Sequence, residues 1–252
     1  MQSLYSYIRT FNIDGHRHVF SHRGINTMTF GGGCIGFMDI ELDELDKYKD
    51  IPGMYDEYIK GHDLKNIRLL ATGLTIEDIK AIYNAHPDVI KGFGELKLYG
   101  TLKGESINRK HISFARDVCR FSEQVGGLPV YIHYMLMEDR EVKAFDKLLT
   151  DFPNVPIVLC HCGMCGHDQE YSWNAAKKLA WAHGNCWLDI SWSAAEWLSK
   201  NPMLLTQIPT DRVFWGSDRS PLADAHNVPN ADNSVFVKYF DSDANIQRLF
   251  AV

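Results

Sequence analysis

The feature that most constrains the fold is a regular alternation of two kinds of segment along the chain. Short apolar segments rich in β-branched residues are followed by longer segments whose apolar residues recur at helical spacing. Because parallel strands need a long crossover connection, usually a helix, this alternation predicts a parallel sheet covered by helices. The expected strands are Phe11–His18, Ile67–Thr72, Val89–Leu98, Pro129–Tyr134, Pro156–His161, Cys186–Ser191 and Val213–Asp218, with Cys34–Ile40 as a weaker candidate for the eighth.

Helices are expected between these strands. Thr75, followed three residues later by Asp78, has the pattern of a helix N-cap. The expected helices are Ile76–His86, Ile107–Gln124, Glu141–Asp151, Gln169–His183 and Ala194–Lys200. Strands that alternate with helices over 252 residues, with no linker between them, predict a single α/β domain over residues 1–252 with a (β/α)8 TIM-barrel fold.

The stretch Val19–Lys65 interrupts the alternation. It contains three consecutive glycines at 31–33 and several acidic residues, but it lacks the Gly-Lys-Ser/Thr sequence of a phosphate-binding loop. We therefore expect a long loop after the first strand. Long loops at the top of a barrel serve as lids, so this one is expected to cover the site.

Composition and charge favour a small-molecule substrate. The formal net charge of −6 and the pI near 6.0 argue against nucleic-acid binding, which needs clustered Lys and Arg. No apolar stretch approaches the roughly 20 residues that cross a bilayer, and the first ten residues lack a secretory signal pattern. We expect a cytoplasmic protein without membrane association, and the sequence leaves open whether it forms a homo-oligomer.

Six cysteines are present, and three of them, Cys119, Cys160 and Cys186, lie in or beside apolar segments. They are predicted to be buried free thiols. Cys162 and Cys165 form a CxxC, which leaves a structural zinc site or a redox pair as alternatives. A structural zinc usually needs a second pair of ligands, and no second CxxC or His pair follows.

Side chains that can bind a metal lie at or near the ends of five predicted strands. They are His16, His18, Glu95, His133, His161 and Asp218. His16 and His18 are two residues apart on a strand, so both can point to one ion. Because the carboxyl ends of all strands of a parallel barrel lie on one face, these groups are expected to gather there. The mixed nitrogen and oxygen donors favour zinc, with manganese, iron, nickel or cobalt as alternatives, and one or two ions.

Taken singly, each of these residues has an ordinary structural explanation. Glu95 and Lys97 could form a salt bridge, and a histidine at a strand end is often a hydrogen-bonded core residue. Asp218 could cap a turn or a helix. Their occurrence together at one face of a barrel favours the metal site.

Read in order, the HxH, the strand Glu, the two strand His residues and the Gly-Ser-Asp resemble the amidohydrolase superfamily, particularly its amidohydrolase 2 and TatD-like branches. The resemblance runs from Ile13 to the C-terminus. Pro-Val-Tyr-Ile-His (129–133), Ile-Val-Leu-Cys-His-Cys-Gly (157–163) and Trp-Gly-Ser-Asp-Arg-Ser-Pro (215–221) are similar to the later strands of that family. Asn-Ile-Gln-Arg-Leu-Phe (245–250) is similar to its terminal helix.

The resemblance implies that His16 and His18 hold a first metal ion. It implies that Asp218 contacts this ion and accepts a proton from the attacking water, acting as the general base. His133 and His161 would hold a second ion. In a one-metal site, His133 would be a ligand while His161 positions the water or the substrate, which gives His161 a catalytic role.

Glu95 resembles the bridging carboxylate of TatD-like proteins, whereas a carboxylated lysine bridges in other branches, so Lys97 is an alternative. Arg17 stands where that family has a small or apolar residue. Arg17, Lys97, Tyr99 and Tyr134 are candidates for binding an anionic group of the substrate.

The implied function is metal-dependent hydrolysis of a small molecule, in which an activated water attacks a C=O or P=O centre. One alternative is a metal-dependent decarboxylase of the same superfamily. A TatD-like nuclease is another, although the acidic charge balance argues against it. A non-enzymatic metal-binding barrel is the third, since fold does not dictate function.

Overall fold

A computed structural model describes residues 11–21, 24–25, 34–38, 40, 47–98, 101–102, 105–106, 108–164, 168–218 and 233–251. Its strands are β1 (Asp14–Ser21), β2 (Gly24–Ile25), β3 (Cys34–Met38), β4 (Ile67–Ala71), β5 (Ile90–Lys97), β6 (Thr101–Leu102), β7 (Glu105–Ser106), β8 (Val130–His133), β9 (Ile157–Leu159), β10 (Cys186–Ile190) and β11 (Val213–Trp215). Its α-helices are α1 (Ile51–Gly61), α2 (Ile76–Ala85), α3 (Asn108–Gln124), α4 (Asp139–Asp151), α5 (Gln169–Ala182), α6 (Trp192–Lys200) and α8 (Ser242–Leu249). Short 3-10 helices are η2 (Cys160–Gly163), η3 (Pro202–Gln207) and η4 (Phe236–Lys238).

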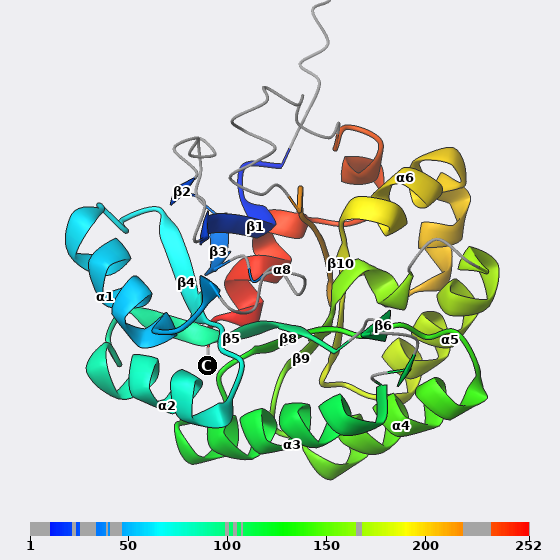
Figure 1. The fold of residues 1–252 in the computed structure, drawn as a ribbon. Helices are drawn as coiled ribbons and strands as arrows, with labels where there is room; N and C mark the ends of the chain where they lie inside the picture. Colours follow the sequence, from blue (N-terminus) through cyan, green and yellow to red (C-terminus); the bar gives the residue numbers. More distant parts are fainter. Residues whose placement is uncertain are drawn as a thin grey trace, which may run out of the picture.

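Eight parallel strands form one curled sheet in the order β1-β3-β4-β5-β8-β9-β10-β11, and β2 pairs antiparallel with β1. The two ends of the parallel series meet, because the backbone N–H of Asp218 donates to the carbonyl of His16 at 2.9 Å. A Cβ at Gly216 would lie 2.4 Å from the His16 Cβ, so this close approach requires glycine. Helices surround the strands in Figure 1, and the predicted (β/α)8 barrel is confirmed.

The predicted helices α2 to α6 are all present, with ends within two residues of the expected ones. Thr75 and Asp78 form the predicted capping box: the Asp78 N–H donates to Thr75 Oγ1, and the Thr75 N–H donates to the Asp78 carboxylate. The expected strand Cys34–Ile40 is also present, as β3.

The prediction that Val19–Lys65 is one long loop is wrong for its described part. β1 extends to Ser21, β3 lies at Cys34–Met38, and Ile51–Gly61 forms helix α1. The helix begins at Asp50, whose side chain accepts from the Gly53 N–H, and it buries Ile51, Tyr55 and Tyr58, a three- and four-residue spacing. Residues 22–23, 26–33, 39 and 41–46 lie outside the described residues, so the lid stays a prediction.

The parallel strands all end at residues other than the predicted ones, and the differences in β1, β9 and β11 affect the candidate site. β1 begins at Asp14 instead of Phe11 and continues past His18. β9 ends at Leu159, so His161 lies in the short helix η2 instead of on the strand. β11 ends at Trp215, which places Asp218 in the following segment with a φ of 54°. Both displaced side chains belong to short turns that leave the strands.

Helix α8 covers the amino-terminal side of the barrel. The Asp243 carboxylate accepts hydrogen bonds from the backbone N–H groups of Asn12 and Ile13, just before β1. The Asn245 amide donates to the carbonyl of Val213, where β11 begins. Ile246 and Leu249 pack into a buried cluster with side chains from the barrel interior, including Phe37, Tyr131, Cys160 and Phe214. This apolar interior forms a floor beneath the carboxyl ends of the strands.

Among the described residues, no helix combines the length and the hydropathy needed to cross a membrane.

Candidate metal centre

The six side chains predicted as ligands gather at the carboxyl side of the barrel. His16 and His18 come from β1, Glu95 from β5 and His133 from the end of β8. His161 and Asp218 follow β9 and β11. Their donor atoms form overlapping groups within 4.8 Å of one another: His16, His18 and Glu95; His16, His161 and Asp218; and Glu95, His133 and His161.

The two histidines of β1 both approach Asp218. The Nε2 of His18 lies 3.1 Å from Asp218 Oδ1, and the Nε2 of His16 lies 3.3 Å from the same oxygen. The side chain of Asp218 is 16% exposed, whereas those of His16 and His18 are 0% and 5% exposed. Asp218 is therefore the member of this group that solvent or a ligand can reach.

Glu95 also approaches the histidines. Its Oε1 accepts a hydrogen bond from His133 Nδ1 at 2.8 Å and lies 3.4 Å from His161 Nε2. Its Oε2 lies 3.6 Å from His18 Nε2. Buried Glu95 therefore lies within 3.6 Å of His133, His161 and His18, so it could be shared between ions held by these histidines.

A buried network that the sequence analysis missed holds two of the histidines. The Nδ1–H of His16 donates to Asp189 Oδ2 at 2.6 Å, and the Ser191 hydroxyl donates to the same oxygen at 2.7 Å. With its proton directed to Asp189, the Ser191 Oγ accepts from His161 Nδ1–H at 2.7 Å. The hydrogen bonds thus fix the tautomer: both Nδ1 atoms carry hydrogen, and both Nε2 atoms are left to act as ligands.

A second buried carboxylate positions the segment that carries Asp218. Asp14 accepts hydrogen bonds from the Ser217 N–H at 2.8 Å, from the Ser217 hydroxyl at 2.5 Å and from the His16 N–H at 3.2 Å. Together with the bond from the Asp218 N–H to the His16 carbonyl, these contacts tie the residues after β11 to β1. The distance between Asp218 and the two β1 histidines is therefore set by backbone contacts as well as by side chains.

The electrostatics of the cluster suit a cation. Burial opposes charge on Glu95, but His133 and His16 outweigh it and hold the pKa of its carboxyl well below the usual range. For Asp218, burial is likewise outweighed by His161 and His16, and its pKa is also lowered strongly. Burial and the neighbouring His161 lower the pKa of His133 to about 4, which keeps this imidazole neutral at pH 7. Against the effect of burial, nearby carboxylates raise the pKa of His16 and His161, so a metal ion would displace a proton from each of these imidazoles.

Two buried atoms test whether a metal ion fits. His16 Nε2 and Glu95 Oε2 have no hydrogen-bond partner among the described residues. A buried polar atom left without a partner is costly, and native proteins leave few of them. A divalent ion would bond to both atoms, because imidazole nitrogen and carboxylate oxygen are ligands for zinc and related metals. The residues present fit a divalent transition metal.

The four candidate substrate-binding residues are placed differently. Lys97 ends β5 two residues after Glu95 and is in register with His133 on β8, so it lies beside the cluster. Arg17 is buried and lies 3.5 Å from Asp14 Oδ2. Tyr134 is buried in the main core and stacks on Phe145 of α4, so the structure does not bring it to the cluster. Tyr99 lies outside the described residues.

Sequence reasoning also missed Trp192, whose ring lies 5.5 Å from that of His161 and is 53% exposed. Asp189 gives the same signal as Glu95, a carboxylate within an apolar strand, and could have been found in Cys186–Ser191. Neither Ser191 nor Trp192 carries a comparable signal, because Ser and Trp are common beside any strand.

The five described cysteines, including Cys160 and Cys162 of η2, are free and buried, as predicted for Cys119, Cys160 and Cys186. Burial raises the pKa of the Cys162 thiol well above its usual value, so it stays protonated. Cys165, the other half of the CxxC, lies outside the described residues.

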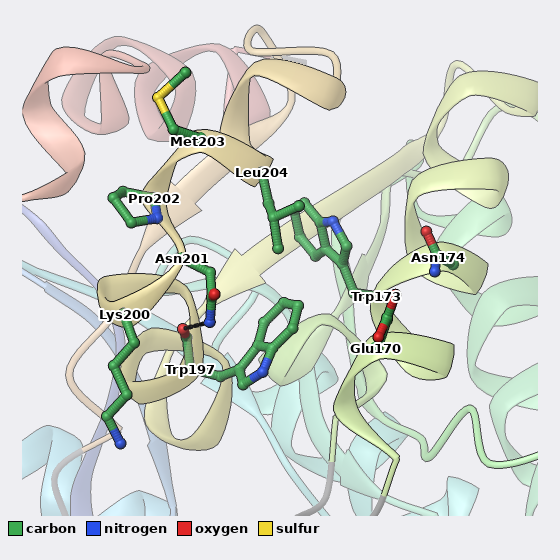
Figure 2. A pocket seen from close by; sticks show the side chains of 9 residues that line it. All are labelled: Glu170, Trp173, Asn174, Trp197, Lys200, Asn201, Pro202, Met203 and Leu204. Carbon is green, nitrogen blue, oxygen red and sulfur yellow. Dashed lines mark hydrogen bonds between the residues drawn. The ribbon is translucent and has the colours of Figure 1, made fainter.

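A separate cavity of about 480 Å³ lies between α5, α6 and η3. Figure 2 shows Trp173 of α5 and Trp197 of α6 extending toward each other in its wall, with ring centroids 6.4 Å apart. Lys200 and Leu204 also line it. These residues lie at the carboxyl end of α6, whereas the histidine cluster lies beside its amino end, so the cavity is distinct from the candidate metal centre.

Solved structures share the fold at low sequence identity. An amidohydrolase from Burkholderia multivorans with bound HEPES is 14% identical, with a TM-score of 0.58, over 96% of this chain and 99% of that chain. Dihydroorotase from Campylobacter jejuni is 14% identical, with a TM-score of 0.54, over 96% and 84%. Amidohydrolase 2 from Bifidobacterium longum subsp. infantis is 14% identical, with a TM-score of 0.55, over 97% and 100%. Such identities show the barrel fold alone.

A search of curated proteins finds no match. A sequence model of the amidohydrolase family matches residues 124–251, about half of the chain. That match includes His133, His161, Asp189 and Asp218, four of the residues that build the cluster. The protein therefore belongs to the amidohydrolase family.

Proposed function

We propose that the protein is a metal-dependent hydrolase that acts on a small molecule, with water attacking a C=O or P=O centre and Asp218 acting as general base. The observation that carries the proposal is the gathering of four histidines and two carboxylates, with His16 Nε2 and Glu95 Oε2 buried and without a hydrogen bond among the described residues. Family membership supports it.

His16 and His18 would hold a first ion with Asp218, and His133 and His161 would hold a second, with Glu95 between them. Zinc is the proposed metal, and the Burkholderia multivorans amidohydrolase has also been solved with bound zinc. A bound divalent ion supplies Lewis-acid polarisation of the substrate and acidifies water. If only one ion binds, His161 positions the water or the substrate.

Asp218 is suited to move the proton. Its side chain is the most exposed of the cluster, so an attacking water can reach it, and its lowered pKa makes it a carboxylate at neutral pH. The carboxylate accepts the proton of the attacking water and returns it to the leaving group, as general base and then general acid. Asp14 and the His16 carbonyl hold the segment that presents it.

Lys97 is the substrate-binding candidate that its position supports. It lies two residues beyond Glu95 on β5, and residues two apart on a strand share a face. We assign to Lys97 the role of binding the anionic group of the substrate. Arg17 and Tyr134 are buried in other surroundings and lack this support.

The test is a screen of the zinc-loaded protein against lactones, amides, phosphoesters and aromatic carboxylic acids in 18O-labelled water. Hydrolysis places one labelled oxygen in the product, and Asp218→Asn should slow the formation of labelled product by at least about 10²-fold. Release of carbon dioxide without labelling would instead support the decarboxylase alternative. If the zinc-loaded protein turns over no member of any class, the hydrolase proposal loses its support.

A further inference from the structure

Trp192 is an exposed aromatic residue beside a cluster whose other members are buried. It is the first residue of α6, directly after Ser191, and 53% of it is accessible to solvent. Most large aromatic side chains of the described barrel are in the core, including Trp173 and Trp215 at 1% and 0% exposure. An indole left in water at this place is apolar surface that a ligand can bury.

The backbone holds Trp192 in this position. Its φ is 42°, in the left-handed region that residues with a Cβ seldom adopt. The preceding residue is fixed, because the Ser191 hydroxyl is engaged by Asp189 and His161. The Ser193 hydroxyl donates to the Met164 carbonyl and anchors the other side. Trp192 is therefore presented by a defined turn between two anchored serines.

The indole borders the candidate metal centre itself. Its ring centroid lies 5.5 Å from that of His161 at an interplanar angle of 78°, and 6.3 Å from that of His133 at 60°. Aromatic rings interact favourably at such separations, in edge-to-face or offset-stacked arrangements. The contact with His161 is close to perpendicular, and about half of the Trp192 residue stays accessible to solvent, which leaves apolar surface for a further ring. A ligand held by the cluster could therefore place a ring against the Trp192 indole.

We propose that Trp192 is a substrate-contacting residue, whose exposed indole packs against a planar, unsaturated ring next to the reacting group. The inference deepens the proposed function and rests on it, since the cluster must hold the reacting end of the substrate. It assigns selectivity for planar rings over saturated rings to one side chain. Metal binding and proton transfer remain with the histidines and acids.

The test compares benzoate with cyclohexanecarboxylate, two probes with the same carboxylate and ring size that differ in planarity. Binding of each to the zinc-loaded protein is measured by calorimetry, and the zinc content is measured in the same samples. Aromatic packing predicts roughly 2- to 10-fold tighter binding of benzoate. Trp192→Leu should remove this preference, and Trp192→Phe should retain most of it.

Trp181→Leu is the matched control, because Trp181 is 63% exposed and bonds to the Gln207 carbonyl on η3, away from the cluster. This variant should keep the preference for benzoate. Three results would overturn the inference: equal binding of the two probes to the wild type, no binding of either probe, or an unchanged preference in Trp192→Leu. If the zinc content is normal in these samples, the proposed function still stands. If the wild type takes up no zinc, the proposed function fails and the inference fails with it.

Discussion

At the scale of single residues, Asp218 and the histidines differ in exposure and in the roles proposed for them. Asp218 is reachable from solvent, whereas the side chains of His16 and His161 are 0% and 1% exposed and their Nδ1 atoms are anchored. In the proposed function, the carboxylate transfers protons in addition to any bond to an ion. The histidines would supply nitrogen ligands held in one tautomer.

Asp218→Asn should lower turnover by at least about 10²-fold, because an amide cannot accept a proton from the attacking water. The fold and most of the bound zinc should be retained, since the histidines and Glu95 remain. Steady-state kinetics on a substrate from the screen, with elemental analysis of the same sample, provide the measurement. Normal turnover in a variant with normal zinc content would show that Asp218 has only a structural role.

Asp189→Asn should weaken zinc binding by about 10- to 100-fold, the usual effect of changing the group that orients a ligating histidine. The amide removes the charge on which His16 Nδ1 and the Ser191 hydroxyl converge. Ser191→Ala is the graded control, because it removes only the link to His161 and should weaken binding less. Competition with a chromogenic chelator measures both. If the zinc affinity of Asp189→Asn is unchanged, Asp189 does not position His16 for metal binding.

The sequence predicted the six clustered residues because each lies at or near the end of an apolar strand. The anchoring network was not predicted, for a physical reason. His16 and Asp189 are 173 positions apart, and nothing local to either residue indicates that the two strands bring them to 2.6 Å. The left-handed conformations of His161 and Asp218 likewise arise from turns whose geometry is set by neighbouring strands.

At the scale of elements, the junction between β1 and the segment after β11 closes the barrel and positions Asp218. The helices around the barrel were predictable from apolar spacing, and α2 also from its cap. Helix α1 was missed although Ile51, Tyr55 and Tyr58 have helical spacing, because the glycines and acids around 31–46 obscured it. Strand ends were the least predictable feature, since tertiary contacts decide at which residue the chain leaves each strand.

Gly216→Ala should damage this junction. The new Cβ would lie 2.4 Å from the His16 Cβ and 2.6 Å from its backbone nitrogen, so β1 must shift. Overpacking of this kind costs about 1–3 kcal/mol of unfolding free energy. Zinc affinity should fall as well, because His16 moves with the strand.

The matched control is Gly61→Ala, since Gly61 ends α1 with nothing within 4 Å of its added Cβ. Denaturant unfolding and zinc titration of both variants give the comparison. Equal stability and equal zinc affinity of the two variants would show that the β1 to β11 contact does not limit either property.

At the scale of the whole molecule, the alternating pattern was enough to predict the barrel, and the barrel was enough to predict that the strand-end side chains meet. The net charge of −6 agrees with a small-molecule substrate better than with a polyanion. The floor formed by Phe37 and Tyr131, whose rings pack against His16, was not predictable, because no local sequence pattern specifies it. Both side chains are fully buried, and charge interactions are stronger in such low-dielectric surroundings than in water.

The central claim is that the cluster binds a divalent metal ion, and elemental analysis of the purified protein tests it most directly. After incubation with zinc and removal of the excess, the wild type should retain between one and two equivalents. His16→Ala should lose metal and activity together while it remains folded by circular dichroism, because it deletes a ligand that Asp189 holds in place. A folded wild-type protein that retains no zinc, and no manganese under the same treatment, would contradict the account.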